Sequence, residues 1–273
     1  MYQSVISNKL SRMTGSIANL KLPYPISLWA VKTFASSFNI NVSEAELPLK
    51  DYKSFNAFFT RNLKSDCRHI ENESATLVSP VDGKISNFGP ITNNKLIQAK
   101  GIEYNLENLI GKDKAADYQD GFFLTIYLAP SDCHRIFMPI DGQIEGYRHI
   151  PGRLFPVRKP YIDTTQNLFI INERLISFIN SKLGKIAVVK VGAFNVGSMS
   201  LAYDDSILTN KPGLAESTTD YKECINMNKG DHLATFHLGS TIVLLLENKP
   251  WVQTEYLNDQ QAIQYGQPIL KLN

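Results

Sequence analysis

The sequence is poor in cysteine and has no long apolar run. Its three cysteines, Cys67, Cys133 and Cys224, form no Cys-x-x-Cys pair, which argues against a zinc site or a disulfide framework and favours a reducing compartment. The best candidate for a membrane span, Leu22 to Val31, holds ten residues before a lysine interrupts it, whereas a spanning helix needs about twenty. Residues 1–22 also lack the apolar core of a secretory signal. We therefore expect a protein that is soluble or lies on a surface.

The chain has no large excess of either charge sign. It holds 28 Lys and Arg against 26 Asp and Glu, a net charge of +2, so we expect no nucleic-acid partner. Hydrophobic residues make up 43% and charged residues 20%, which is ordinary for a globular protein. The length of 273 residues suits one large domain or a core with an appendage.

Residues 1–65 read as a helical region. Pro25 suits the first turn of a helix, and apolar residues follow it at mostly helical spacing. Ser43 with Glu46 forms a capping-box pattern, and Ser54 opens a further short helix. Because the region combines aromatic faces with basic residues, its helices either pack on the main domain or attach to anionic lipid, and different helices can do each.

Residues 66–273 read as a β-rich core, because short apolar runs alternate there with Gly, Pro and Asp turns. One helix is expected over Asn105 to Ile110, and the polar stretch Asp205 to Lys229 reads as a loop. The predicted strands are Leu77 to Val78, Phe122 to Leu128, Ile186 to Val191, Val196 to Tyr203 and Thr241 to Glu247.

A short internal echo refines this picture. The segment from Ser79 to Ile85 resembles the segment from Met138 to Ile144, since each contains Pro, an aliphatic residue and Asp-Gly. Asp-Gly between strands is typical of a tight hairpin turn, so we predict two hairpins in a pseudo-symmetric core. The expected fold class is α+β, with a helical N-terminal region on a β-rich, barrel-sandwich-like core.

The pair Gly239-Ser240 stands one residue before an apolar run, Ile242 to Leu246, that reads as a buried strand. Such a pair is commonly a turn, but it is also a place where a chain can cut itself. Glycine accepts unusual backbone geometry, and the Ser240 hydroxyl can attack the preceding carbonyl and convert the amide into an ester. Elimination and hydrolysis then leave a pyruvoyl group, an electrophile that no coded side chain provides.

Self-cleavage needs a base, because an unassisted serine is a poor nucleophile. Of the five histidines, His134 stands out because it follows a predicted core strand and a turn and precedes an arginine. His237 is closer to Ser240 in sequence, but it stands three positions before Ser240, so in a strand their side chains point to opposite faces.

Several segments together resemble the phosphatidylserine decarboxylase family, most clearly between Phe55 and Glu247. They occur in the family's order and at its approximate spacing. The matching segments are Ser54 to Arg61, Ser79 to Gly83, Gln98 to Gly101, Tyr127 to Arg135, Pro151 to Phe155, Asn172 to Arg174, Val191 to Ala193, Val196 to Ser198 and Phe236 to Thr241.

This resemblance implies a lyase that converts phosphatidylserine to phosphatidylethanolamine and CO₂ in phospholipid biosynthesis. Ser240 would be the cleavage nucleophile and the source of the covalent pyruvoyl cofactor, which forms a Schiff base with the substrate. Cleavage between Gly239 and Ser240 would turn the zymogen into a β chain (1–239) and an α chain (240–273). Asp82 would be the acidic triad member and His134 the base, and no metal is implied.

The resemblance also implies a cellular location and an oligomeric state. We expect a peripheral protein on the cytoplasmic side of the cell membrane, with the α and β chains associated and a homodimer as its assembly. Residues 1–65 would meet the membrane surface. Arg153 and Arg158 flank the loop from Pro151 to Val157 and could approach lipid phosphate, although either could also be a solvated surface residue. Asp141 is expected to be structural.

One departure from the family's pattern affects the base. The family usually carries Asp-Tyr-His-Arg-x-His-Met-Pro, whereas this chain has Cys133 for the tyrosine and Phe137 for the second histidine. Three readings stay open: His134 is the working base, another group substitutes or maturation is slow, or the chain is an unprocessed relative.

Two other functions compete with decarboxylation. A non-processing barrel-sandwich relative that acts as a binding or scaffold protein would explain the repeated Asp-Gly turns but not Gly239-Ser240. A Ser-His-Asp hydrolase is less favoured, because the G-x-S-x-G elbow is absent.

Overall fold

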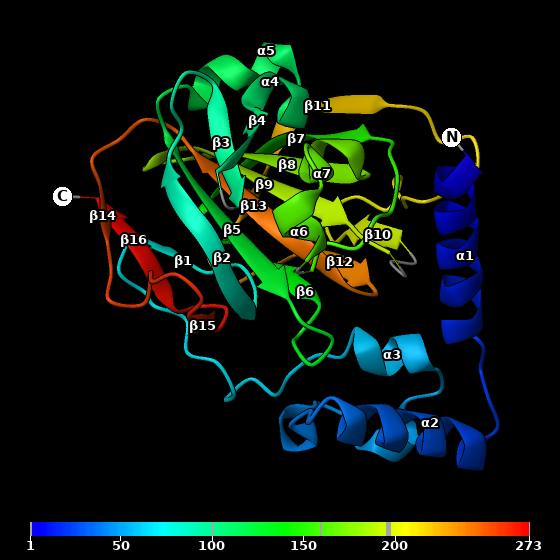
Figure 1. The fold of residues 1–273 in the computed structure, drawn as a ribbon. Coiled ribbons are helices and arrows are strands. Elements are labelled where there is room, and N and C mark those ends of the chain that lie inside the picture. Colours follow the sequence, from blue (N-terminus) through cyan, green and yellow to red (C-terminus); the bar gives the residue numbers. More distant parts are fainter. Residues whose placement is uncertain (1, 100, 159, 195–197, 273) are drawn as a thin grey trace.

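The computed structural model describes residues 2–99, 101–158, 160–194 and 198–272. Lys100, Val196 and Gly197, which belong to the sequence motifs above, lie outside these residues, as does the side chain of Ser240. Figure 1 shows a β-rich body with helix α1 along one side of it and helix α2 below it. The N-terminal helices are α1 (Tyr2–Ala18), α2 (Tyr24–Ser37) and α3 (Phe55–Phe59), with 3-10 turns η1 (Val42–Glu44) and η2 (Leu49–Asp51).

Local chemistry explains where these helices begin. Pro25 lies in the first turn of α2, where its missing N–H costs nothing. The Ser54 hydroxyl caps α3 by accepting a hydrogen bond from the Ala57 N–H at 3.1 Å. The capping box predicted for Ser43 and Glu46 is wrong. The turn begins earlier, and Asn41 caps it by accepting from the Ser43 N–H.

The main feature of the body is an antiparallel sheet of eight strands. Their order is β11-β7-β8-β9-β13-β5-β2-β15, and β13 therefore lies between β9 and β5 with every residue from Thr241 to Leu246 buried. The bounds are β2 (Gly83–Pro90), β5 (Phe122–Leu128), β7 (Gly142–Ile150), β8 (Arg174–Ser181), β9 (Gly184–Gly192), β11 (Ser217–Met227), β13 (Ser240–Leu246) and β15 (Ala262–Ile263).

Three smaller sheets and several short helices complete the body. The sheets have the orders β1-β16-β14, β10-β12-β6 and β3-β4, and the described strands form no closed barrel. The α+β class is thus confirmed. The strands are β1 (Thr76–Val78), β3 (Lys95–Ala99), β4 (Ile102–Asn105), β6 (Arg135–Phe137), β10 (Ser198–Leu201), β12 (His232–His237), β14 (Trp251–Gln253) and β16 (Pro268–Leu272), and the helices are α4 (Leu106–Ile110), α5 (Lys112–Ala115), η3 (Ala116–Tyr118), α6 (Tyr161–Thr164) and α7 (Leu168–Ile171).

The predicted strands are confirmed within a few residues, but the loop predicted over Asp205 to Lys229 is wrong for Ser217–Met227. It contains β11, an edge strand of eleven residues whose side chains are exposed or half-buried. A strand that buries neither face needs no apolar pattern, since its pairing with β7 comes from backbone hydrogen bonds.

The two predicted Asp-Gly hairpins are also wrong, but the internal echo is real. Strand β1 pairs with β16 and strand β2 with β5, so the first Pro-x-Asp-Gly segment passes from a small sheet into the large one. The second segment does the same between β6 and β7. The residue before each segment bonds the other segment: the Val78 N–H donates to the Pro139 carbonyl at 2.9 Å, and the Phe137 N–H donates to the Pro80 carbonyl at 2.8 Å.

The N-terminal helices have a small core of their own. Val31, Phe58 and Tyr52 belong to a buried cluster separate from the main core of the sheets. A third cluster joins the two parts, because Ala18 of α1 and Phe59 of α3 pack with Leu238 of the β body. The helices therefore reach the chain just before Gly239-Ser240.

Candidate active site

The bond between Gly239 and Ser240 lies where β12 passes into β13. The backbone of Ser240 pairs with Leu128 of β5 and with Gly192 of β9, so residue 240 is fixed from both sides. Gly239 is half-buried, and a Cβ placed on it would meet no heavy atom within 4 Å. One side of the bond is thus held in the sheet, and the other side has space around it.

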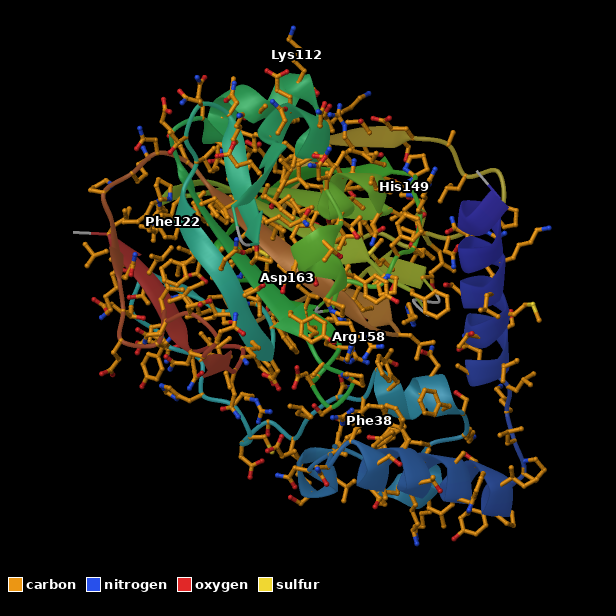
Figure 2. All side chains as sticks on the ribbon, in the orientation of Figure 1. Phe38, Lys112, Phe122, His149, Arg158 and Asp163 are labelled. Carbon is orange, nitrogen blue, oxygen red and sulfur yellow. The ribbon has the colours of Figure 1, made fainter. Side chains whose placement is uncertain are left out.

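That space belongs to an apolar cavity of about 970 Å³ with Gly239 on its wall. Figure 2 labels Phe38 and Arg158, which line it from the α2 side and the β side respectively. The helical wall includes Phe34, Phe38, Phe55 and Phe59, and the opposite wall includes Tyr127, Val157, Arg158 and Tyr161. The cavity thus joins the N-terminal helices to the predicted cleavage site.

His134 is completely buried next to this region. Its ring lies 4.0 Å from the ring of Phe59, centroid to centroid, and Phe59 also packs with Leu238. Nδ1 lies 3.0 Å from the Asp132 carbonyl oxygen. A carbonyl can only accept, so Nδ1 carries the hydrogen and Nε2 carries the lone pair.

The Nε2 atom of His134 is buried and has no hydrogen-bond partner among the described residues. Burial lowers the pKa of His134 from 6.5 to about 3, because the charged imidazolium would lose its hydration. The ring is therefore neutral at pH 7 and presents a free lone pair, which is the state that a general base requires.

Asp82 is also buried, at 5% exposure, and belongs to an ionic cluster. Arg68 donates three hydrogen bonds to it, from Nε to Oδ1 at 3.1 Å and to Oδ2 at 3.3 Å, and from Nη2 to Oδ2 at 2.7 Å. Arg68 also contacts Glu44 at 2.9 Å. Burial opposes the Arg68 charge, yet the bonds and charges of Asp82 and Glu44 outweigh it and raise the pKa of Arg68. The Tyr265 N–H donates to Asp82 at 2.9 Å.

The structure does not bring Asp82 and His134 into hydrogen-bond contact. Within the described part of the chain, the carboxylate of Asp82 bonds Arg68 and Tyr265, and the ring of His134 bonds only Asp132. Burial raises the pKa of Asp132 and of Cys133, and the negative charge of Asp82 raises both pKa values further. Any effect of Asp82 on His134 would thus act through space.

Phe137 occupies a place beside the Asp82 cluster. Its ring stacks on Tyr265 with centroids 4.0 Å apart, and Tyr265 is the residue whose N–H bonds Asp82. The ring of His232 lies 6.0 Å from Phe137, and burial lowers the pKa of His232 to about 4. At the position where the family usually has its second histidine, this chain therefore has an aromatic stack.

Sequence reasoning missed two groups of residues here. Arg68, the partner of Asp82, lies fourteen residues before it in a segment without a motif. Asn56 bonds His237, with Nδ2 and Nδ1 3.2 Å apart, and the Ser200 hydroxyl lies 3.0 Å from Nε2 of the same ring. Asn56 does lie in a matching segment, Ser54 to Arg61, but nothing local shows which distant residue it contacts.

Comparison with known proteins gives a consistent result. A family model described as phosphatidylserine decarboxylase matches residues 55–271. The chain is 37% identical over 270 residues to the phosphatidylserine decarboxylase proenzyme of Myxococcus xanthus (strain DK1622), which covers 98% of this chain and 96% of that protein. It is 41% identical over 242 residues to the proenzyme of Anaeromyxobacter sp. (strain K), over 88% of this chain and 86% of that one. The proenzyme of Brevibacillus brevis is 39% identical over 265 residues, with 96% and 93% covered.

Proposed function

The chain belongs to the phosphatidylserine decarboxylase family, and on this premise we propose how the proenzyme matures and acts. It cuts itself between Gly239 and Ser240, and the pyruvoyl group made from Ser240 serves the conversion of phosphatidylserine to phosphatidylethanolamine and CO₂. The observation that carries this proposal is the location of Gly239. It lies on the wall of an apolar cavity whose Phe59 also packs against a buried, neutral His134.

In the first step the hydroxyl of Ser240 attacks the carbonyl carbon of Gly239. His134 takes the hydroxyl proton at Nε2, and backbone N–H groups hold the developing oxyanion. The C–N bond then breaks and the nitrogen of residue 240 receives a proton, which leaves an ester. The free lone pair on Nε2 and the fixed Nδ1–H of His134 support this role.

Asp82 is the acidic member of the proposed triad. A protonated imidazole in an apolar site is costly, and a nearby carboxylate lowers that cost. The carboxylate of Asp82 bonds Arg68 and not His134. We therefore propose that Asp82 acts on the histidine by its charge and without a hydrogen bond. We propose His134 as the working base in this chain, since the Phe137 side chain cannot take a proton.

The residues around Gly239 suit a covalent electrophile. Residue 240 is fixed in a central strand, and the cavity beside it has room for a substrate amine. When formed, a pyruvoyl group supplies a carbonyl that accepts that amine and draws electrons as CO₂ leaves. The apolar walls disfavour a substrate carboxylate and so favour its loss, and His134 can return a proton to the product.

The substrate is a lipid, and the cavity offers matching chemistry. Its phenylalanines suit acyl chains, and Arg158 is exposed on the same wall without a carboxylate partner in the described residues. An arginine binds phosphate with two parallel hydrogen bonds. We therefore assign Arg158 to the lipid phosphate, between the serine headgroup and the acyl chains.

Helices α1 and α2 would bring this cavity to the bilayer. No described helix is both long and apolar enough to cross a membrane, yet these helices expose large apolar side chains, among them Met13 at 60%, Ile17 at 63% and Trp29 at 69%. Exposed apolar groups beside basic ones, such as Lys9 and Lys32, favour attachment to anionic lipid. We place the enzyme at the cytoplasmic side of the membrane, as a homodimer of associated α and β chains.

Vesicle flotation tests the membrane role. Trp29→Glu should reduce binding to vesicles that contain phosphatidylserine at least about fivefold, because a charge replaces an apolar anchor. Ile97→Glu is the matched control, since Ile97 is 48% exposed on β3, outside the N-terminal helices. Equal binding by the two variants would remove the N-terminal helices from the membrane-binding role.

An activity assay tests the chemistry. The purified protein should release CO₂ from phosphatidylserine vesicles, and borohydride in the presence of substrate should inactivate it by fixing the lipid to the α chain. The Ser240→Ala variant should release no CO₂, and borohydride should fix no lipid to it. Full activity in Ser240→Ala would refute the proposed function.

A further inference from the structure

Leu238, the residue before Gly239, has a backbone conformation that L side chains avoid. Its φ is +93°, in the left-handed half of the map. The other seven described non-glycine residues with positive φ are Asn, Asp or Gln, with φ between +51° and +61°. Asparagine and aspartate tolerate this region because their side chains bond locally, whereas leucine gains nothing there. Leu238 is therefore strained.

Packing explains why Leu238 stays in this conformation. Its side chain is 7% exposed and is buried with Ala18, in the last turn of α1, and Phe59, at the end of α3. Phe34 and Phe55 pack against the same cluster. Relaxing φ would withdraw the leucine from this apolar socket, so burial against the N-terminal helices opposes the relaxation.

A second contact holds the residue before it. Asn56 of α3 donates from Nδ2 to His237 Nδ1 at 3.2 Å, and His237 Nε2 then donates to the Ser200 hydroxyl at 3.0 Å. The Asn56 amide also bonds Asn19, next to α1, at 2.9 Å. Helix α3 thus holds His237 by a polar contact and Leu238 by an apolar one.

The chain is fixed on the other side of the bond as well. Residue 240 pairs with both β5 and β9, while Gly239 has free space around its Cα. A segment fixed at 237 and at 240 must absorb any mismatch between them at 238 and 239. The distortion appears at Leu238, one residue from the bond that is to break.

We propose that α1 and α3 form a clamp that holds Leu238 in its strained conformation and thereby speeds self-cleavage, with Leu238 as a positioning residue. The inference rests on the proposed cleavage between Gly239 and Ser240. When the oxygen of Ser240 bonds the Gly239 carbon and the C–N bond breaks, the tether between these residues gains one bond and loses the planar amide. The segment can then relax, so the strain lies in the uncut chain and is released along the reaction.

The clamp is tested by the rate of self-cleavage after refolding of the full chain, followed on a denaturing gel. Leu238→Gly accepts positive φ without strain and leaves the socket empty, so it should slow cleavage about tenfold or more. Leu238→Met keeps the Cβ and the side-chain volume, so its cleavage rate should lie within about twofold of the wild-type rate. Leu238→Asn tolerates the left-handed region and should be slow like the glycine variant.

Asp120→Gly is the control for changing a positive-φ residue. Asp120 has φ of +55° in an exposed turn before β5, and its replacement should leave the rate unchanged. Melting temperatures in a Ser240→Ala background show that each variant folds. Hydroxylamine, which cuts the ester but not the amide, should release less fragment from Leu238→Gly than from the wild type.

The outcomes separate the two proposals. If the wild-type chain never breaks between 239 and 240, the proposed function fails. If it does break, and folded Leu238→Gly and Leu238→Asn break equally fast, the clamp alone is refuted. Slow cleavage in both variants with rescue by methionine supports the clamp.

Discussion

The two Pro-x-Asp-Gly segments use the same backbone device in different surroundings. Asp82 accepts a hydrogen bond from the Tyr265 N–H at 2.9 Å, and Asp141 accepts one from the Lys229 N–H at 2.7 Å. Each donor precedes a glycine in the left-handed region, Gly266 with φ of +87° and Gly230 with φ of +86°. Both aspartates therefore stabilise a neighbouring turn.

What differs is the environment of the carboxylate. Asp141 is exposed and bonds a backbone N–H, whereas Asp82 is buried and also holds Arg68, which reaches Glu44. The Asp82 turn lies next to the strand that carries Tyr127 and Leu128, and Leu128 pairs with Ser240. A motif shared by two turns thus sets backbone geometry, and burial with a cationic partner distinguishes the candidate site.

The largest expected difference concerns self-cleavage. Asp82→Asn keeps the shape but removes the charge, and we expect at least about a hundredfold slower cleavage, in the range seen when an acid–base partner is lost. Asp141→Asn should change the rate less than about twofold. Gel-based rates for the two variants measure this, and equal rates would remove the distinction between the turns.

Stability should differ in the same direction. Asp82→Ala leaves the Arg68 guanidinium, with 7% of its side chain exposed, beside Glu44 alone, and losing one partner of a buried pair costs about 3–5 kcal/mol. Asp141→Ala removes one exposed contact and should cost about 1 kcal/mol. Urea unfolding in a Ser240→Ala background gives both values. A similar small loss for the two would mean that Asp82 is not held as a buried ion.

The two glycines provide a smaller contrast. A Cβ on Gly266 would collide with the His69 backbone carbonyl, whereas a Cβ on Gly230 would approach only the Ile70 side chain at 3.3 Å. Both substitutions cost about 1 kcal/mol or more for the left-handed backbone. Gly266→Ala should lose roughly 1–2 kcal/mol more than Gly230→Ala, since backbone cannot easily yield. The unfolding midpoints of the two variants measure this difference. A lower midpoint for Gly230→Ala than for Gly266→Ala would contradict the expectation.

The last expected effect is a pH dependence of stability that comes from His134. Its pKa is about 3 when folded, against an ordinary 6.5, so below pH 6.5 the unfolded chain binds a proton that the folded chain does not. Stability should then fall as pH falls from 6.5 toward 3, by at most about 1.4 kcal/mol per pH unit. His134→Asn cannot titrate and should show a shallower slope between pH 6.5 and 5. Identical slopes would show that His134 is not buried as a neutral group.

The sequence predicted strongly periodic elements well and long-range partners poorly. Phe122 to Leu128 forms β5 with the expected bounds, because a short apolar run that is rich in aromatic residues and bounded by turns fits a fully buried strand. The Asp-Gly turns predict hairpins wrongly, since a turn signal does not show which strands pair with each other. The edge strand β11 has no apolar face and so gave no signal.

The site shows the same division. Gly239-Ser240, His134 and Asp82 could be singled out from motifs, and their roles stay proposals. Arg68 and the strain at Leu238 could not be found, because both depend on residues distant in sequence. A leucine with positive φ contradicts local preference, and the cause is a socket assembled from two helices of the N-terminal region.

The most direct test of the central claim is the intact mass of the purified, folded protein under denaturing conditions. We expect two chains that end at 239 and begin at 240, with the smaller one carrying a pyruvoyl group in place of its amino group. Ser240→Ala should give one mass for the whole chain. A wild-type protein that stays in one piece, or that breaks elsewhere, would contradict the account.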